Sequence, residues 1–185
     1  AASTRRTSIT PKVQESLGVI NDFIGSNYAI VIKFDKDKGI YRYANASNNP
    51  DYFLKKTEFR LEDSECNELK TLFSDRNYLE LNNRDNPAVC KVIETFIANP
   101  NKPMLFKIVN PDLSLGGFIV FEETNKEFKK LHSKEIQKLI KVFIEMIVNV
   151  DMRYVQDESL NNLKDSLEVK VLERTKELHA NEVKL

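Results

Sequence analysis

The feature that most constrains this chain is its last segment, which runs from Ser133 to Leu185 without a proline or a glycine. Nothing in that segment would end a helix, and at about 1.5 Å per residue it would extend roughly 75 Å as one continuous helix. A single globular domain cannot cover a helix of that length, which is instead typical of a coiled coil. We therefore predict a folded domain with a helix that projects beyond it.

The apolar residues of this segment change their spacing along its length. They are dense as far as Val150 and then fall on alternating three- and four-residue steps, which is the a/d pattern of a coiled coil. Asp157 and Lys164 occupy a positions, and polar residues there fix the register at a cost in stability. A solvated single helix is the alternative, because charged a positions weaken pairing. The residues that we predict to contact a partner helix are Ile136, Phe143, Ile147, Val150, Leu160, Leu167, Val171 and Leu178.

Length and composition suit one globular domain with an appendage. The chain has 185 residues, of which 41% are hydrophobic and 30% are charged, so a substantial core is possible. We expect residues 1–9 to be disordered or left over from expression, and residues 10–150 to form the domain. Residues 151–185 would then form the projecting coiled coil. A second full domain does not fit in this length.

Before the last segment, the residue patterns predict helices and strands in an α+β order. Thr10–Pro11 is a favourable helix start, and Gly25 is well placed to end that helix. Runs of β-branched and aromatic residues predict one hairpin over Tyr28–Ala44 and a second over Met104–Phe121. The strand after Gly116–Gly117 is apolar on both faces, so we expect it to lie centrally in the sheet.

The middle of the chain, Asn45–Pro103, is irregular in pattern. Ser64 is a candidate cap for a short helix, Tyr78–Leu81 a candidate short strand, and Asn86–Pro87 a second favourable helix start. This order lacks the regular strand–helix alternation of a parallel sheet. We therefore predict a central antiparallel sheet with helices beside it.

The balance of charge argues against several classes of protein. Lys+Arg and Asp+Glu are equal at 28 each, whereas nucleic-acid binders and polybasic membrane-contacting segments carry a basic surplus. We therefore expect no nucleic-acid partner and no direct membrane contact. No apolar run approaches the roughly 18 residues that span a bilayer, and the two cysteines form no disulfide framework. We expect a cytoplasmic location, which leaves open a membrane attachment elsewhere in a parent protein.

Candidate catalytic and metal-binding residues are few. Cys66 and Cys90 are more typical of small apolar packing residues than of nucleophiles, with a redox-sensing disulfide between them as an alternative. His132 precedes a predicted helix cap, and His179 lies on the exposed half of the last helix, so we expect both at the surface. We expect no catalytic residue and no metal, because a zinc site needs four well-spaced ligands.

The segment Leu167–Leu178 reads LEVKVLERTKEL, and Asn181 follows it. It resembles the connecting helix of bacterial signalling proteins, in which a Glu-Arg-Thr and a following Glu-Leu precede a sensor histidine kinase core or a diguanylate cyclase. The resemblance implies that an output domain of one of these classes follows Leu185.

The part of the chain before that helix resembles a GAF domain. The resemblance rests on the opening helix, the two hairpins with Gly116–Gly117, and the spacing of Phe128 and Glu135 at the entry to the last helix. It implies a sheet of about six antiparallel strands flanked by helices and a pocket covered by the middle segment. It also implies a parallel homodimer through the N- and C-terminal helices. PAS and related sensor folds are the near alternative.

Several GAF subgroups have residue patterns that this chain does not match. The Asn-Lys-x-Phe-Asp-Glu pattern of cyclic-nucleotide-binding members is absent, and Lys33–Asp35 is a chance fragment of it in the first hairpin. Bilin-binding members usually attach the chromophore through a Cys near a His, and neither Cys66 nor Cys90 has such a neighbour. The GAF-fold free methionine sulfoxide reductases rely on several pocket cysteines, whereas both cysteines here fall in predicted helices.

The function that these features favour is a regulatory sensor module. It would bind an unknown small molecule and transmit the binding through a dimeric helix to the output domain. A ligand-free dimerisation module is the alternative, which a dry, aromatic-packed interior would favour, and a reductase is a third hypothesis. Side chains with an aromatic body and a polar tip suit a pocket wall. The pocket candidates are Tyr41, Tyr43, Phe73, Tyr78, Phe106 and Lys107.

Overall fold

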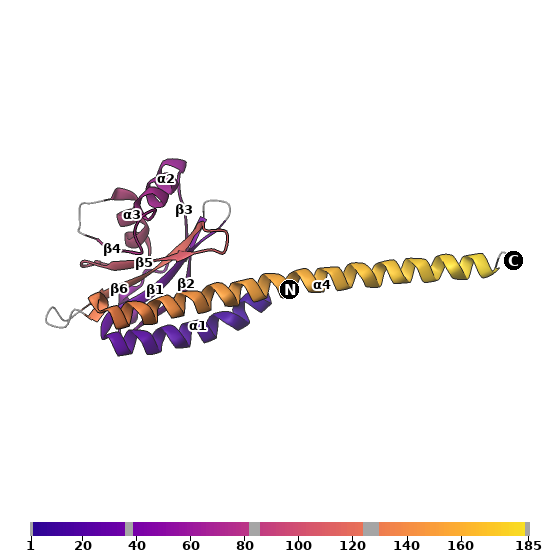
Figure 1. The fold of residues 1–185 in the computed structure, drawn as a ribbon, viewed down its shortest axis with the longest axis horizontal. Helices are drawn as coiled ribbons and strands as arrows, with labels where there is room; N and C mark the ends of the chain where they lie inside the picture. Colours follow the sequence, from indigo (N-terminus) through magenta and orange to yellow (C-terminus); the bar gives the residue numbers. More distant parts are fainter. Residues whose placement is uncertain (1, 36–38, 82–85, 124–129, 184–185) are drawn as a thin grey trace.

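The computed structural model describes residues 2–35, 39–81, 86–123 and 130–183, with side chains described from Pro11 onward (Figure 1). Two single 3-10 turns lie at Pro50–Tyr52 and Lys130–His132. The helices are α1 (Ala2–Ile24), α2 (Asp63–Leu72), α3 (Pro87–Phe96) and α4 (Lys134–Val183). The strands are β1 (Ser26–Phe34), β2 (Gly39–Ser47), β3 (Glu58–Arg60), β4 (Tyr78–Glu80), β5 (Met104–Val109) and β6 (Leu115–Glu123).

Six antiparallel strands form one sheet in the order β3-β2-β1-β6-β5-β4. Both predicted hairpins are confirmed, as β1–β2 and β5–β6, and β6 lies centrally between β1 and β5 as expected. Gly117 has a φ of 150°, and a Cβ there would collide with the carbonyl of Ile32 on β1. The close approach of the two central strands therefore requires glycine at this position.

Helices cover both faces of the sheet, giving three layers (Figure 1). Helices α2 and α3 lie on one face, and α1 and α4 lie side by side on the other. Because successive strand residues point to opposite faces, β1 must be apolar on both. Ile30 and Ile32 face α2 and α3, whereas Ala29 and Val31 face α1 and α4.

Helix α1 ends as predicted and begins earlier. Gly25, at a φ of 73°, closes the helix with its N–H donating to the carbonyl of Asn21 at 2.9 Å. The helix begins at Ala2, not at the predicted cap Thr10, and Pro11 lies inside it. No other proline and no glycine precede Pro11, so the residues ahead of it are free to be helical. The predicted apolar face is buried against the sheet through Val13, Leu17, Ile20 and Ile24.

The middle of the chain contains the elements that sequence patterns described least well. The predicted cap Ser64 is wrong: Glu62 occupies the N-cap of α2, and its N–H donates to the Glu65 carboxylate at 3.1 Å. Asn86 does hold the N-cap of α3, but in a left-handed conformation without a side-chain hydrogen bond. Strand β3 was not predicted, because a three-residue edge strand with two charged residues has no recognisable apolar alternation.

Helix α4 is one unbroken helix of 50 residues, as its sequence predicted. Ser133 caps it by accepting a hydrogen bond from the Ile136 N–H at 3.2 Å. At about 1.5 Å per residue the helix is roughly 75 Å long, and its second half projects well past the domain (Figure 1). Leu185 and Phe128 lie outside the described residues. Among the residues that the structure describes, no helix combines the length and apolar character needed to span a membrane.

Candidate functional site

The chain's own side chains occupy the space between the sheet and helices α2 and α3, where we predicted a pocket. Phe73 is 3% exposed and stacks on Phe118 with ring centroids 5.8 Å apart. Phe34 packs edge-on against the same ring at 5.5 Å. Ile93 and Phe96 of α3 are fully buried in this layer. Phe73 is therefore a core residue and not a pocket wall.

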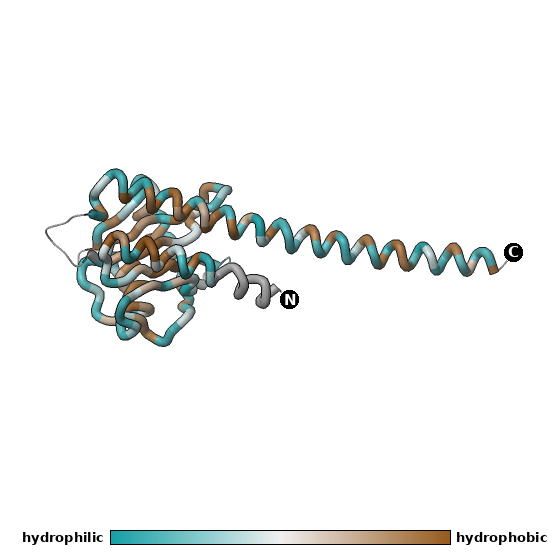
Figure 2. Tube along the Cα trace, turned by 90° about the horizontal axis from the view of Figure 1, so that it is seen from below, coloured by the Kyte–Doolittle hydropathy of each residue, from teal (hydrophilic) through white to brown (hydrophobic). Residues whose placement is uncertain are grey.

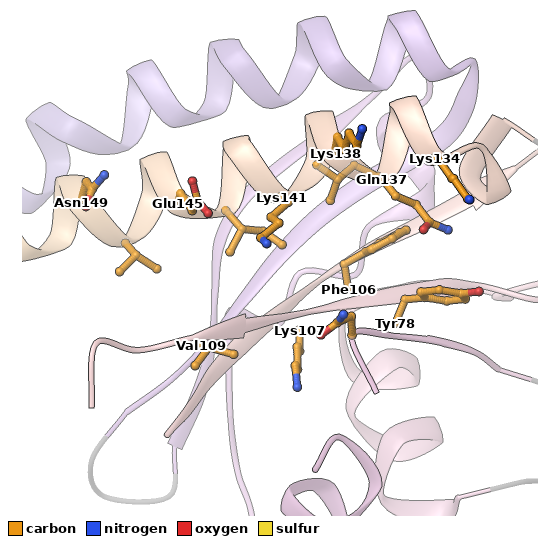
Figure 3. Close-up of a pocket in the computed structure, with 14 residues that line it drawn as sticks. Tyr78, Phe106, Lys107, Val109, Lys134, Gln137, Lys138, Lys141, Glu145 and Asn149 are labelled. Carbon is orange, nitrogen blue, oxygen red and sulfur yellow. The ribbon is translucent and has the colours of Figure 1, made fainter. Parts of the chain in front are cut away.

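A groove of about 680 Å³ lies on the opposite face of the sheet, between α4 and the strands β4 and β5 (Figure 3). It forms because α1 covers β1 and β2, while α4 reaches only as far as β5 and leaves the edge of the sheet open. Phe106 and Ile140 are buried at its base, and Ile144 and Val148 are half-buried. Its volume lies within the range of about 300–1,000 Å³ that is usual for small-molecule pockets. The polar residues that α4 contributes are Lys134, Gln137, Lys138, Lys141, Glu145 and Asn149.

Three of the six predicted pocket residues line this groove, which is not the pocket that we predicted. Tyr78 and Phe106 pack with ring centroids 5.9 Å apart. Lys107 also lines the groove, but its side chain points away from α4 (Figure 3). Its Nζ donates to the carbonyl of Phe73 at 3.1 Å, on the other face of the sheet. Only Tyr78 and Phe106 therefore present side chains where a ligand in the groove would lie.

The two remaining predicted residues lie on β2, at a cluster that joins the sheet to α4. Tyr43 donates a hydrogen bond from its hydroxyl to the Asp151 carboxylate at 3.3 Å. Asp151 also forms an ion pair with Lys33 of β1, whose Nζ lies 4.7 Å from the centroid of the Tyr43 ring. Tyr41 is the direct cross-strand neighbour of Lys33. Lys33 is only 8% exposed, so it depends on this partner to remain charged.

The Lys33–Asp151–Tyr43 cluster was missed by sequence analysis, although a signal for it exists. Lys33 interrupts the apolar and aromatic run Tyr28–Phe34, and Asp151 follows directly on the apolar half of α4. Each breaks a local pattern, but no spacing rule links two residues so far apart in the chain. The cluster lies just before Tyr154, the last buried residue of α4, and thus where the helix leaves the domain.

The first half of α4 is buried against its own sheet, which corrects part of the predicted dimer contact. Ile136, Phe143 and Ile147 are between 0% and 8% exposed, and Val150 is half-buried. The side chains of Ile136, Phe143 and Ile147 therefore pack in the core against the sheet, not on a partner helix, whereas the partner contact of the half-buried Val150 stays a prediction. This happens because the apolar face of an amphipathic helix packs against the sheet of its own domain. Other apolar residues of this half are exposed, namely Leu139 at 38%, Val142 at 62% and Met152 at 38%.

The second half of α4 exposes the stripe that the a/d pattern predicted (Figure 2). Leu160, Leu167, Val171 and Leu178 are between 53% and 64% exposed, and Leu163 beside them is 57% exposed. Nothing in the described chain covers them. An apolar stripe of this length on a projecting helix is typical of a helix that pairs with another.

The exposed stripe and the groove lie along different stretches of α4, since the groove ends at Asn149 and the stripe begins at Leu160. A helix turns by about 100° per residue, so each residue can be placed around the axis relative to the row that faces the sheet. Leu139, Val142, Leu160 and the stripe beyond them fall on one side of that row. The α4 residues at the centre of the groove fall on the other side, namely Gln137, Lys141, Ile144 and Val148. The outer rim of the groove points away from the sheet, as the stripe does, through Lys138, Glu145 and Asn149. A partner that covers only the stripe from Leu160 onward would therefore leave the groove open, because the groove ends before the stripe begins.

A second buried polar cluster lies at the beginning of β1, on the α2/α3 face. Glu122 is 6% exposed and accepts hydrogen bonds from the Asn27 side chain at 3.2 Å and the Asn101 N–H at 2.9 Å. Tyr28 is fully buried nearby, with its ring 5.5 Å from that of Tyr52. Burial, helped by the charge of Glu122, raises the pKa of Tyr28 far above its ordinary value. The hydroxyl therefore stays neutral within the fold.

The cysteines and histidines are not gathered into a site. Cys66 lies on α2 and Cys90 on α3, and both are free thiols, half-buried against the α2/α3 core. His132 is exposed and contacts the Glu80 carboxylate at 2.5 Å, and His179 is exposed on the projecting part of α4. Within residues 2–35, 39–81, 86–123 and 130–183, no three His, Cys, Asp or Glu side chains are grouped to hold a metal ion.

Comparison of the sequence with known proteins finds no match. No protein-family model matches the chain. No curated protein matches it either.

Comparison of the fold, in contrast, finds solved structures of GAF domains. The chain superposes on the PixJ GAF domain of Thermosynechococcus elongatus in its blue-light-absorbing form, with a TM-score of 0.57 and 11% identity, covering 85% of this chain and 95% of that one. The phycocyanobilin-bound GAF domain of a cyanobacterial phytochrome gives 0.56 at 10% identity, covering 82% and 94%. A GAF domain/HD domain protein of Geobacter sulfurreducens gives 0.54 at 14% identity, covering 80% and 94%. The chain therefore has the fold of a GAF domain.

Proposed function

We propose that this chain is a regulatory sensor module of a bacterial signal-transduction protein. Two copies pair in parallel through α1 and α4, and α4 carries the signal to an output domain of the histidine kinase or diguanylate cyclase class. The segment of α4 that resembles the connecting helices of such proteins supports this choice of output. The module itself catalyses no reaction and works in the cytoplasm.

The observation that carries the proposal is the bare stripe on the projecting half of α4. A fully buried Leu or Val side chain contributes about 1.5–3 kcal/mol relative to an exposed one. The four predicted stripe residues, 53–64% exposed in one chain, gain this stabilisation only when a second helix covers them. Exposed apolar residues also lie on α1, the other helix of the proposed pair, since Val19 is 66% and Phe23 61% exposed.

The Lys33–Asp151–Tyr43 cluster supports a role in transmission. It connects two central residues of the sheet to α4 at the point where the helix leaves the domain. A shift of the sheet relative to α4 changes the distance between Lys33 and Asp151, so the ion pair favours one position of the helix. Ligand binding acts on such an equilibrium by stabilising one arrangement over the other.

A ligand-free dimerisation module is the second candidate, and the filled α2/α3 interior favours it. A bilin of the kind bound by the phytochrome neighbour has no place there, because Phe73, Phe118 and Phe34 already occupy the space. The reductase hypothesis has less support, since Cys66 and Cys90 are both half-buried against the apolar α2/α3 core and neither lines the groove beside α4. The two leading candidates share the paired helix and differ in whether a ligand acts on it.

A disulfide-trapping experiment tests the parallel pairing. In a background with Cys66 and Cys90 changed to Ser, we place a single cysteine on the stripe by Leu178→Cys. In a parallel pair the two copies of this position face each other, so mild oxidation should give a covalent dimer. Lys176→Cys is the matched control, since it lies about 200° away around the helix. Equal crosslinking of both variants, or none from either, would contradict the proposal.

A further inference from the structure

We infer that the groove between α4 and strands β4 and β5 is a binding site for an amphipathic anion, that is, a small molecule with an extended apolar body and a carboxylate or similar acidic group. The inference deepens the proposed function, on which it rests, because it names the chemical class of the sensor's ligand. It places that ligand on the α1/α4 face of the sheet and not under the α2/α3 cover.

The base of the groove is apolar along its whole length. Phe106 is 5% and Ile140 1% exposed, and the half-buried Ile144 and Val148 continue the surface along α4. From Lys134 to Asn149 the groove follows α4 for roughly 22 Å at about 1.5 Å per residue. This shape suits an elongated apolar body better than a compact polar molecule.

The rim of the groove carries unneutralised positive charge. Lys134, Lys138 and Lys141 are exposed along it (Figure 3). Glu145 is the acidic residue of the lining, so the rim has an excess of positive charge. Within the described part of the chain, none of the three lysines forms an ion pair. Lys134 also begins α4, where the helix dipole adds a partial positive charge.

The rim charge decides between the possible occupants of the groove. A second copy of this chain carries no net charge, and its apolar stripe begins at Leu160, beyond the end of the groove at Asn149. An anion gains from each lysine, whereas a cation is repelled by the same rim. Tyr78 at the edge of the sheet offers one further hydrogen-bond donor to an acidic group.

The position of the groove explains how such a ligand would act on the helix. One wall is α4 itself, between its N-terminus and the Lys33–Asp151–Tyr43 cluster. A ligand that fills the groove contacts both α4 and the edge of the sheet, so it stabilises one position of the helix relative to the sheet. Because the partner-facing stripe begins at Leu160, beyond the groove, a dimer paired through the stripe keeps both grooves accessible.

The test is a calorimetric titration of the full chain with decanoate, a simple amphipathic anion. Decyltrimethylammonium, with a chain of similar length and the opposite charge, is the matched probe. We expect decanoate to bind and the cation to bind at least tenfold more weakly. The double variant Lys138→Gln/Lys141→Gln should weaken decanoate binding about tenfold, since it removes two positive charges from the rim of the groove.

Two further variants separate the groove from the rest of the chain. Val148→Trp fills the groove without changing its charge and should abolish decanoate binding. Lys170→Gln/Lys176→Gln removes two lysines from the projecting part of α4 and should leave decanoate binding unchanged. Circular dichroism and the thermal midpoint of each variant confirm that the fold is retained.

Three outcomes would overturn the inference: no decanoate binding, equal binding of both probes, or binding that Val148→Trp leaves intact. Each of these is distinguishable from failure of the proposed function, which depends on Leu178→Cys crosslinking in the absence of any probe. If the chain crosslinks through Leu178→Cys but does not bind decanoate, the paired helix is supported and the anion site is refuted.

Discussion

The two halves of α4 belong to one continuous helix and differ in what covers them. From Ile136 to Tyr154 the apolar row lies against the sheet, with its core-facing residues at most 9% exposed. From Leu160 onward the apolar residues lie on a helix that no other described element touches, and those of the stripe are more than half exposed. The burial of the first half is internal to one chain, whereas that of the second half requires a partner.

This difference shows how one helix can be both firmly attached and free to rearrange. The first half gains its stability from the domain, so α4 cannot detach without unfolding the α1/α4 face. In the proposed dimer, the second half gains stability only from pairing, and its charged a positions Asp157 and Lys164 keep that pairing weak. A small change at the boundary between the halves can therefore alter the pairing without unfolding the domain. The following variants separate the contributions of the two halves.

The largest effect is expected from a cavity in the first half. Phe143→Ala removes a ring that is 4% exposed, and should lower the free energy of unfolding by about 3–5 kcal/mol, measured by urea denaturation. Leu139→Ala, on the same stretch but 38% exposed, should cost less than about 1 kcal/mol. Similar losses for both would mean that the first half is not anchored through its sheet-facing row.

A charge in the stripe of the second half should affect pairing and leave the domain intact. Leu167→Asp buries a carboxylate in the paired helix and should weaken dimerisation by about 2–3 kcal/mol, or some 30- to 150-fold in dissociation constant. Val169→Asp introduces the same charge at a site that is 54% exposed and off the stripe, so dimerisation should persist. Analytical ultracentrifugation measures both, and equal weakening would argue against the a/d register.

The boundary between the halves should be sensitive to loss of the Asp151 charge. Asp151→Asn leaves the 8%-exposed Lys33 without its carboxylate, and should lower the free energy of unfolding by about 1–2 kcal/mol. The cost is smaller than for a fully buried pair because the Asp151 side chain is 36% exposed. Asp165→Asn, at an exposed position of the projecting half and off the a/d stripe, is the control and should have little effect on a urea unfolding curve.

The smallest effect is expected away from α4, at Tyr28 on the α2/α3 face. Folding raises the pKa of Tyr28 above its unfolded value of about 10. The neutral hydroxyl therefore makes its full contribution to the free energy of unfolding below pH 10, and this contribution is lost as the pH rises further. The loss should approach about 1.4 kcal/mol per pH unit. Tyr28→Phe removes the hydroxyl that titrates. The difference in the free energy of unfolding between the two proteins should therefore be constant below pH 9 and change above pH 10. If this difference in the free energy of unfolding stayed constant up to pH 11, it would contradict the raised pKa of Tyr28 in the folded chain.

Much of the fold was predictable because its elements have strong local patterns. Val13, Leu17 and Ile20 mark the buried face of α1, and the glycines before Phe118 mark the central strand. The start of α1 and the cap of α2 were not predictable, because a favourable cap such as Ser64 competes with neighbouring residues that the sequence does not rank. Short edge strands such as β3 give too few residues for a period to appear.

The sites were much less predictable than the fold. Tyr78 and Lys138 lie 60 positions apart in sequence and line the same groove, only because β4 lies at the sheet edge beneath α4. The periodicity of each element gives its buried face but not which element covers it. The same limit explains why Phe143 was assigned to a partner helix: an apolar row looks alike whether a sheet or a second helix covers it.

The most direct test of the paired helix is the mass of the purified chain in solution, by sedimentation equilibrium over a range of protein concentrations. The account predicts a species of twice the 21.4 kDa of one chain, converted to the single-chain mass by Leu167→Asp. A chain that sediments at 21.4 kDa at every concentration tested would contradict the pairing of α4, on which the proposed signalling role depends.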